Sequence, residues 1–384
     1  MSTMNVKREP TESPPRTLEG LAKLVGVSRA TASNAFNRPD QLSDELRKRI
    51  LETARSIGYA GPDPTARALS RGMQGAVGLV FTEQLSYAFS DPAAVRILEG
   101  LARSCEEAET GLLLVPVSAG SEGSAERAIN GASVDALALY SLPDEDPAVA
   151  AARARGLSTV TIDQPLVEGI PYVGLDYREA ARLALNHLLE LGHRRVGVLA
   201  YRLRPQRHMG EVAWEHQQES DYHSTRERLK GYEDALDAFD IGWDTLVFRE
   251  TRSNDSEGGA AGATEMLRMP ERPTAILTDS DQLAIGVLRA AGHAGLAVPI
   301  DLSVIGMDDV PAALGATPAL TTVHQPLVEK GRLAGQILLG QRAPDHVTHF
   351  PVELVVRDTT ASPKVEDVPH VASARPRRFG LEEE

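Results

Sequence analysis

Short apolar runs alternate with helical patterns through most of the chain, from Ala76 onward. Such alternation is typical of parallel sheets covered by helices on both faces. So many strands in one sheet would be unusual, and we therefore expect two similar α/β lobes. Sheets of this type bind ligands beyond the carboxyl ends of their strands. The expected strands are Ala76–Phe81, Leu112–Val117, Ala136–Tyr140, Thr159–Ile162, Tyr172–Leu175, Val196–Leu199, Leu246–Phe248, Ala275–Leu277 and Val304–Gly306.

The length of the chain and its lack of long apolar segments restrict the classes of protein to which it can belong. A chain of 384 residues exceeds the usual limit of a single core, so two or three domains are expected. No segment approaches a membrane span, and Met1–Pro15 is polar, without a signal-peptide core. We therefore expect a cytoplasmic protein without a membrane partner. The single cysteine, Cys105, excludes an internal disulfide and a cysteine-based metal site, and we expect it to be a small buried helix residue.

The charge is distributed unevenly along the chain. The net charge of −14 argues against a nucleic-acid partner, but residues 1–72 carry 12 Lys and Arg against 8 Asp and Glu. Because phosphate attraction acts over about 10 Å, a basic head on an acidic body is compatible with DNA binding.

The first sixty residues predict two helices joined by a tight turn. Thr17 precedes an amphipathic segment, Leu18–Val25, and Gly26 offers the positive φ that ends it. Ser28 is a strong N-cap for a second helix, Arg29–Phe36. This is the pattern of a helix-turn-helix.

A third helix is expected after the polar segment Asn37–Leu42. Ser43 caps it, and it stops at Gly58. One face is apolar, and the other carries Arg47, Lys48, Arg49 and Arg55, which are placed to meet phosphates; the apolar residues are Leu46, Ile50, Ala54 and Ile57. A small helical bundle with a solvated charged surface would show the same pattern, so these residues alone leave both interpretations open.

The residues Leu18-Glu-Gly-Leu-Ala-Lys-Leu-Val-Gly-Val-Ser-Arg-Ala-Thr-Ala-Ser-Asn-Ala-Phe-Asn37 resemble the start of the lac-repressor (LacI/GalR) family of bacterial regulators. That family shows Leu-x-x-Val-Ala-x-x-Ala-Gly-Val-Ser-x-x-Thr-Val-Ser-x-Val-Leu-Asn. The resemblance implies a transcriptional regulator, most simply a repressor, that binds operator DNA through this helix-turn-helix.

The resemblance also assigns expected DNA contacts. It implies that Arg29, Ala30 and Asn34 read base edges in the major groove. Asn34 stands where the family often has Arg or His, and an Asn amide matches adenine best. The remaining expected positions contact phosphate or fix helix ends, and they are Thr17, Ser28, Thr31, Ser33 and Asn37.

A short hinge helix is expected over residues 61–72. Asp63 is a good N-cap, Pro64 suits the first helical position, and Gly72 ends the segment. So short a helix is marginal in water unless it packs against a partner. By resemblance to the family, paired hinge helices enter the minor groove and Leu69 wedges open a base step. A plain interdomain linker is the alternative.

The resemblance extends through the α/β part, to about residue 358. It implies a two-lobed, periplasmic-binding-protein-like sensor domain that binds a small effector and controls DNA affinity allosterically. The segments that carry it are Leu191–Val196, Arg228–Tyr232, Ser280–Gly286, Val298–Asp309 and Leu320–Pro326.

Polar residues at strand ends are the expected effector contacts. By resemblance these are Thr82, Asp163, Arg228, Asp281, Asp308 and Gln325. Carboxylates and amides that each take two hydroxyls, with one arginine fork, suit a polyhydroxylated ligand such as a sugar. For any single aspartate, a capping or strand-end role is the alternative, most evenly balanced for Asp281.

Two further segments are candidates for the cleft mouth. Leu85–Asp91 places Tyr87 and Phe89 where a ring could stack on a ligand. Arg202–His223 is a long charged insertion that we interpret as a lid or surface loop. Its three histidines, His208, His216 and His223, suggest a metal, but no His-x-x-x-His pair is present, so we expect neither a metal nor another cofactor.

The sequence disfavours two other functional classes. An enzyme is not expected, because no Gly-x-Ser-x-Gly, P-loop or His-Glu-x-x-His motif is present. A sugar-binding transport protein would need a signal peptide and would have no use for residues 17–72. Hinge pairing and pseudo-palindromic half-sites need two heads, so a homodimer is expected. A tetramer is not expected, because the tail after Asp358 lacks the leucine heptads that tetramerise some members of the family.

These inferences predict a definite domain layout. The expected parts are a disordered N-terminus (1–15), an all-α helix-turn-helix domain (16–60), a hinge helix (61–72), a two-lobed α/β effector-binding and dimerisation domain (73–358) and a disordered tail (359–384).

Overall fold

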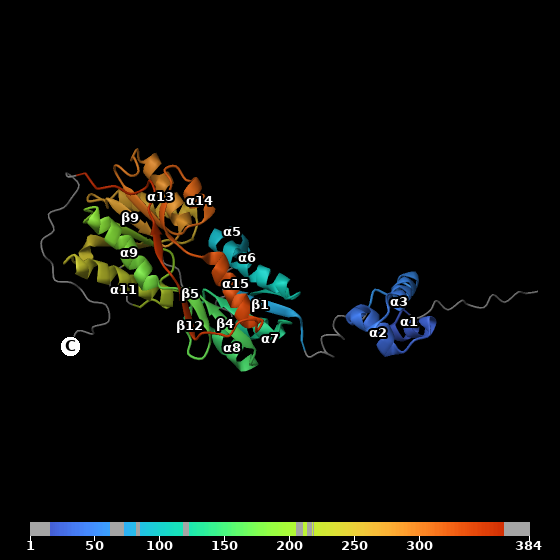
Figure 1. Ribbon diagram of the computed structural model, residues 1–384. Coiled ribbons are helices and arrows are strands. Elements are labelled where there is room, and N and C mark those ends of the chain that lie inside the picture. Colours follow the sequence, from blue (N-terminus) through green and yellow to red (C-terminus); the bar gives the residue numbers. More distant parts are fainter. Residues whose placement is uncertain are drawn as a thin grey trace, which may run out of the picture. The chain divides into compact units, whose positions relative to one another are not determined.

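The computed structural model describes residues 16–61, 73–81, 85–117, 123–204, 210–212, 217 and 219–364 (Figure 1). The chain divides into two compact units, Met1–Gln74 and Gly75–Glu384. Most of the expected hinge helix, including Leu69, lies outside the described residues, and so does Thr82. In the part of the chain that is described, no helix has the length and apolar character needed to cross a membrane.

Within its described residues, the first unit holds three α-helices whose ends follow the sequence signals. They are α1 (Leu18–Val25), α2 (Arg29–Asn37) and α3 (Asp44–Ser56), with a 3-10 turn, η1 (Pro39–Gln41), before α3. Thr17 Oγ1 accepts from Gly20 N at 3.1 Å, and Ser28 Oγ accepts from Thr31 N at 2.9 Å. Gly26 ends α1 with a φ of 74°, which confirms the predicted turn.

A small core holds these helices together. Leu21 of α1, Ala35 of α2, and Ile50 and Ala54 of α3 are buried against one another. Phe36 and Tyr59 close one edge with a T-shaped ring contact at 5.8 Å. The apolar face predicted for α3 is therefore the face that packs, and the opposite face is left to solvent.

The second unit contains two sheets, as the alternating pattern predicts. The first sheet has six strands in the order β12-β5-β4-β3-β1-β2, all parallel. Its strands are β1 (Ala76–Phe81), β2 (Gly111–Pro116), β3 (Ala136–Tyr140), β4 (Ser158–Ile162), β5 (Tyr172–Leu175) and β12 (Val347–Phe350). The helices of this lobe are α5 (Tyr87–Ser90), α6 (Pro92–Glu107), α7 (Ser124–Gly131), α8 (Pro147–Arg155) and α15 (Leu327–Leu338).

The second sheet has seven strands in the order β13-β11-β10-β9-β6-β8-β7, with antiparallel strands at its two edges. Its strands are β6 (Val196–Ala200), β7 (Gly210–Glu211), β8 (Leu246–Glu250), β9 (Ala275–Thr278), β10 (Ser303–Asp308), β11 (Thr321–His324) and β13 (Glu353–Val355). The helices of this lobe are α9 (Tyr177–Glu190), α11 (His223–Ala238), α12 (Ser256–Leu267), α13 (Asp281–His293) and α14 (Pro311–Gly315), with a 3-10 turn, η2 (Trp243–Thr245).

The chain crosses between the two lobes three times: after β5, after β11 and after β12. Strand β7 and the last three strands were not expected from the sequence. Strand β11 reads Thr-Thr-Val-His, in which the polar side chains hide the strand pattern.

Helices α6 and α15 pack backbone against backbone in the first lobe. A Cβ atom at Gly100 would lie 1.9 Å from Val328 O, and one at Gly331 would lie 2.1 Å from Ile97 O. Only glycine permits this approach. Both helices begin near the carboxyl ends of the strands, where Asp91 caps α6 and Gln325 precedes α15.

The expected end of the domain at Asp358 is wrong. Thr359 is fully buried, and its Oγ1 accepts from Thr321 N at 2.8 Å and donates to Val304 O at 2.7 Å. His193, whose pKa burial lowers to about 4, lies 3.0 Å from Ala361 O through Nε2. Residues 359–364 are therefore part of the fold, because they satisfy backbone groups of the second sheet.

Candidate functional site

Helix α2 presents the residues predicted to contact DNA. Arg29 and Ala30, at its start, are exposed, and Asn34 is half-buried one turn later. Ser28 caps the helix start and also bonds to the Thr31 hydroxyl, and Asn37 Nδ2 donates to Ser33 Oγ at 3.1 Å. Thr17 lies apart from these residues, at the start of α1.

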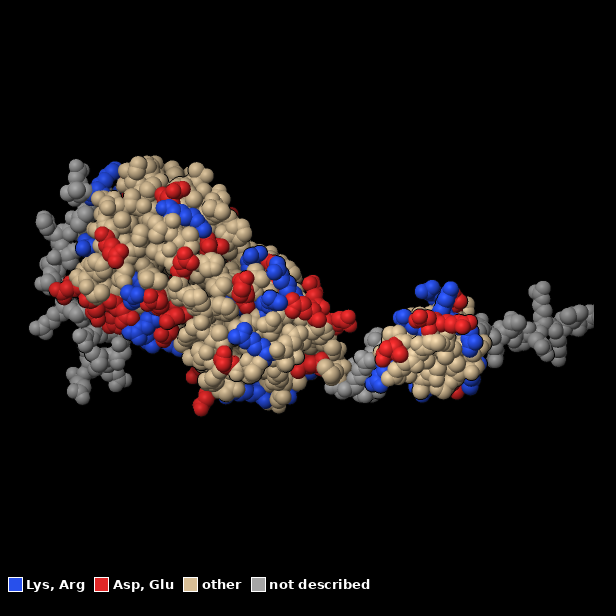
Figure 2. All heavy atoms as spheres, in the orientation of Figure 1, with Lys and Arg blue, Asp and Glu red and all other residues tan. Residues whose placement is uncertain are grey.

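Basic side chains of α3 are exposed on the same unit. Arg47, Lys48, Arg49 and Arg55 all lie on its outer surface, as the helical spacing predicts. Arg49 also donates to Val25 O at 3.2 Å and so links α3 to the end of α1. On the face shown in Figure 2, basic and acidic side chains are interspersed on both units. Exposed guanidinium and ammonium groups on the unit that carries the exposed start of α2 suit contact with phosphates.

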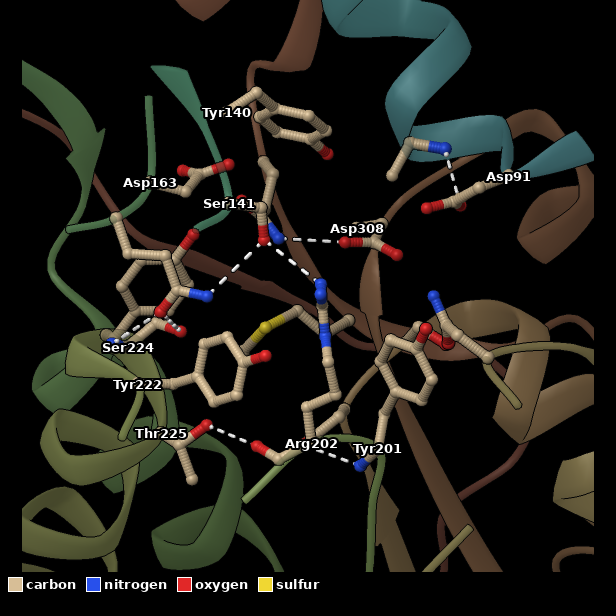
Figure 3. A pocket seen from close by; sticks show the side chains of 18 of the residues that line it. Asp91, Tyr140, Ser141, Asp163, Tyr201, Arg202, Tyr222, Ser224, Thr225 and Asp308 are labelled. Carbon is tan, nitrogen blue, oxygen red and sulfur yellow. Dashed lines mark hydrogen bonds between the residues drawn. The ribbon is translucent and has the colours of Figure 1, made fainter. Parts of the chain in front are cut away.

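A cavity of about 110 Å³ lies between the two lobes of the second unit (Figure 3). Its lining combines carboxylates, amides, hydroxyls and aromatic rings. Five of the predicted effector contacts line it: Tyr87, Asp163, Arg228, Asp308 and Gln325.

Two predicted contacts lie elsewhere. Phe89 does not line the cavity, and its side chain is 65% exposed. Tyr87 and Phe89 are two positions apart in the short helix α5, so their side chains point in nearly opposite directions. Asp281 is fully buried: Oδ1 accepts from Thr322 Oγ1 at 2.6 Å and Oδ2 accepts from Val310 N at 2.8 Å. It ties strand ends together, which is the alternative that the sequence left open.

Arg228, from α11, is held by a carboxylate that sequence reasoning missed. Its Nε and Nη2 each lie 3.3 Å from an oxygen of Asp279, and its guanidinium lies 5.5 Å from the Tyr177 ring centroid. Burial opposes the charge of Arg228 and is the largest single effect, but the attraction of Asp279 together with that of Tyr232, Tyr177 and Asp308 outweighs it, so the pKa of Arg228 is raised. The pair fixes a flat, charged group in the cavity wall.

A buried lysine lies behind the cavity. Lys330, in α15, has no exposed surface; its Nζ pairs with Asp163 and donates to Gln325 Oε1 at 2.8 Å. Gln325 Nε2 in turn donates to Asp308 Oδ1 at 2.8 Å. This chain of contacts joins the first lobe to the carboxyl end of β10. A lysine on a helix gives no signal of such a role in the sequence.

The cavity is rich in desolvated carboxyl groups. Burial raises the pKa of Asp91, although Tyr87 and the N–H of Ala93 oppose the shift. Burial and the neighbouring Asp281 and Asp91 raise the pKa of Asp308 well above its ordinary value. These carboxyl groups favour ligands that donate hydrogen bonds to them, and they disfavour negatively charged ligands.

Hydrogen bonds join the two lobes beside the cavity. Asn254 Nδ2 donates to Tyr87 Oη at 3.0 Å, and Tyr87 stacks on Tyr201 with centroids 6.5 Å apart. Gln164 Oε1 accepts from Ser224 Oγ at 2.7 Å and from Ser224 N at 3.1 Å. Each bond joins a residue of the first lobe to one of the second.

The predicted lid segment contributes to the cavity at both ends. Arg202 donates to Ser141 Oγ at 3.2 Å, and its guanidinium lies 4.9 Å from the Tyr201 ring and 5.1 Å from the Tyr222 ring (Figure 3). Tyr201 and Arg202 directly follow the buried strand β6, which is the one signal that pointed to them. The remaining lining residues that the sequence did not indicate are Phe81, Ala93, Tyr140, Ser280, Thr225 and Met307.

The described ranges contain no group of three or more His, Cys, Asp or Glu side chains that could hold a metal ion. His208 and His216 lie outside those ranges, whereas His223 begins α11 and meets the Tyr172 ring edge-on at 6.1 Å.

Two family models match separate parts of the chain. Residues 17–61 match the model of bacterial regulatory proteins of the lacI family, and residues 185–360 match a periplasmic binding protein-like domain. The first match covers the described helices of the first unit, and the second lies within the two-lobed unit.

Relatives match over most of the chain. The HTH-type transcriptional regulator Rv3575c of Mycobacterium tuberculosis is 42% identical over 332 residues, which are 86% of this chain and 92% of that protein. IpsA of Corynebacterium glutamicum, also an HTH-type transcriptional regulator, is 41% identical over 84% of this chain and 90% of its own length.

Solved structures share the fold. A LacI-family transcriptional regulator from Corynebacterium glutamicum gives a TM-score of 0.69 at 36% identity, covering 90% of this chain and 98% of that one. A complex of the transcriptional regulator CelR with cellobiose gives 0.62 at 28% identity, covering 89% and 99%. CelR is a protein of Thermobifida fusca.

Proposed function

Because this chain belongs to the lacI family of bacterial transcriptional regulators, which are not enzymes, we propose that it is an effector-controlled repressor of operator DNA. The effector is a polyhydroxylated small molecule of the sugar type, bound in the cavity between the lobes. Its binding changes the affinity of the helix-turn-helix for DNA.

The chemistry of the cavity supports this effector class and is the observation that carries the proposal. Asp91, Asp163 and Asp308 supply acceptors, Gln164 and Asn254 supply amides, and rings of Tyr87 and Tyr201 are available to stack. Vicinal hydroxyls pair well with carboxylates and amides, whereas an anionic ligand would meet a surplus of buried acids. CelR, a relative with the same architecture, is described in complex with the sugar cellobiose.

The exposed start of α2 supports the operator contact. In the proposed complex Arg29, Ala30 and Asn34 face base edges, while Ser28, Thr31, Ser33 and Asn37 fix the helix or meet phosphate. Leu69 is proposed to enter the minor groove at the operator centre, as the sequence predicts.

We further propose a homodimer on a pseudo-palindromic operator, because two heads are needed for two half-sites. Apolar side chains on one edge of the first lobe support this assembly. Leu113 lies on the edge strand β2 and Val95 lies on the neighbouring α6, and each is 39% exposed. Sedimentation of the purified chain at micromolar concentration tests this part of the proposal.

The decisive experiment combines selection with titration. Duplexes selected from random DNA by the full chain are labelled, and fluorescence polarisation is followed as neutral sugars, polyols, amino sugars and sugar acids are added. We expect sequence preference, a change of operator affinity with a neutral or amino ligand, and loss of that response in R228M. A chain that prefers no duplex sequence, with or without these compounds, would refute the proposal.

A further inference from the structure

The side-chain amide of Asn34 is held from outside its own helix. Asn34 Nδ2 donates to Gln41 Oε1 at 3.1 Å. Asn37, by contrast, donates to Ser33 within α2. The orientation of Asn34 therefore depends on the turn that follows α2.

That turn gives Gln41 a fixed position. Gln41 is the last residue of η1, and its backbone N donates to Arg38 O at 3.1 Å. The next residue, Leu42, donates to Pro39 O at 3.2 Å and packs against the core of the head. Ser43 then caps α3. The Gln41 side chain itself is exposed, so it contributes little to the core.

The hydrogen bond selects one of the two orientations of the Asn34 amide. Gln41 Oε1 is an acceptor, so it attracts the NH₂ group of Asn34 and repels the carbonyl oxygen. One N–H of Asn34 is thereby used. The carbonyl oxygen and the second N–H remain as an acceptor and a donor on neighbouring atoms, which is the pattern complementary to N6 and N7 of adenine.

We propose that Gln41 is a specificity-determining positioning residue: it fixes the Asn34 amide so that the base facing Asn34 is read as adenine. The inference rests on the proposed function, because it requires α2 to lie in a major groove. It goes beyond that function by assigning a role to a residue of the turn.

Selection from random duplexes by the full chain tests the inference with three substitutions. N34A identifies the half-site position that Asn34 reads. Q41M keeps the length of the side chain but removes the acceptor, whereas Q41E keeps an acceptor and adds a negative charge. E52Q, on the exposed surface of α3, is the matched control, and thermal unfolding of each variant reports the integrity of the head.

We expect Q41M to lower the preference for adenine at that one position by roughly 2- to 10-fold, the effect of one lost hydrogen bond. Other positions and binding to unselected DNA should stay unchanged. Q41E should retain the adenine preference but bind all duplexes more weakly, because its charge faces phosphates. E52Q should match the unmodified chain in base preference.

Two results would overturn the inference. One is an unchanged adenine preference in Q41M, and the other is an equal loss of preference at every position, which would indicate damage to the head rather than to one contact. An unmodified chain without any sequence preference would instead refute the proposed function, so the two failures are distinguishable.

Discussion

Lys330 Nζ pairs with the carboxylate of Asp163 although no part of the Lys330 side chain reaches solvent. A buried ion pair of this kind contributes little compared with a well-packed apolar pair, but it is costly to break, because the remaining charge is left without a partner. The ion pair therefore affects stability mainly through the buried, unpaired charge that remains when one partner is removed.

The first prediction concerns this pair. K330M should lower the free energy of unfolding by about 3–5 kcal/mol, because the Asp163 carboxylate loses its counter-ion. Urea unfolding measures the change. K230M removes a lysine that is 43% exposed and paired with Glu227, and should cost no more than about 1 kcal/mol. If the role of Lys330 is electrostatic, the double variant D163N/K330M should lose less than the sum of its parts.

A second prediction follows from the raised pKa of Asp308. The folded chain keeps this proton at pH values at which the unfolded chain has released it. The contribution of Asp308 to stability is therefore complete below about pH 4 and is lost as the pH rises toward the raised pKa. D308N removes the titration, while its amide oxygen can still accept from Gln325.

The free energy of unfolding of D308N relative to the unmodified chain should therefore rise with pH, by up to about 1.4 kcal/mol for each pH unit. Urea unfolding at several values between pH 5 and pH 8 measures this difference. The lowered pKa of His193 acts with the opposite sign in both chains and cancels in the comparison. If the difference in free energy of unfolding did not vary with pH, the raised pKa of Asp308 would be contradicted.

The third prediction concerns residues 359–364. A chain ending at Asp358 leaves Thr321 N and Val304 N without their acceptors, at a cost of about 1–3 kcal/mol for each buried group. A chain ending at Lys364 keeps both bonds. Thermal unfolding of the two truncated chains should show a lower midpoint only for the shorter one, and equal midpoints would count against the role of Thr359.

The fourth prediction concerns the contact between α6 and α15. G331A places a methyl group against Ile97 O and should cost about 1–3 kcal/mol as the helices separate. G131A, also in a helix but with no atom within 4 Å of the added Cβ, should be neutral or stabilising by up to about 1 kcal/mol. Urea unfolding should therefore show a loss of stability for G331A and none for G131A, and a neutral G331A would contradict the close approach.

Much of the architecture is local information and was readable from the sequence. The caps at Thr17, Ser28 and Ser43 depend on residues within one turn, and most strands from β1 to β10 contain a short apolar run; the exceptions are β4, which alternates Thr with apolar residues, and the two-residue β7. Strands β11 to β13 were not predicted because they are short and contain polar residues. They are strands because they pair with segments that are distant in the sequence.

The same difference between local signals and long-range contacts decides which residues of the candidate effector site could be predicted. Asp163 and Asp308 could be placed because they stand at the ends of apolar strands, and Arg228 could be placed because it stands in a segment that resembles the family, within α11. Lys330 and Asn254 could not, since their roles depend on partners far away in the sequence, Asp163 and Tyr87. Phe89 was placed wrongly because the sequence does not show which way a four-residue helix faces.

The bonds that join Tyr87 to Asn254 and Gln164 to Ser224 have a kinetic consequence. Both bonds join one lobe to the other, so a ligand whose entry requires the lobes to separate can be taken up only after they break. For such a ligand, the observed rate of association should level off as its concentration rises, at the rate at which the lobes separate. The response of the regulator would then be limited by this motion rather than by diffusion.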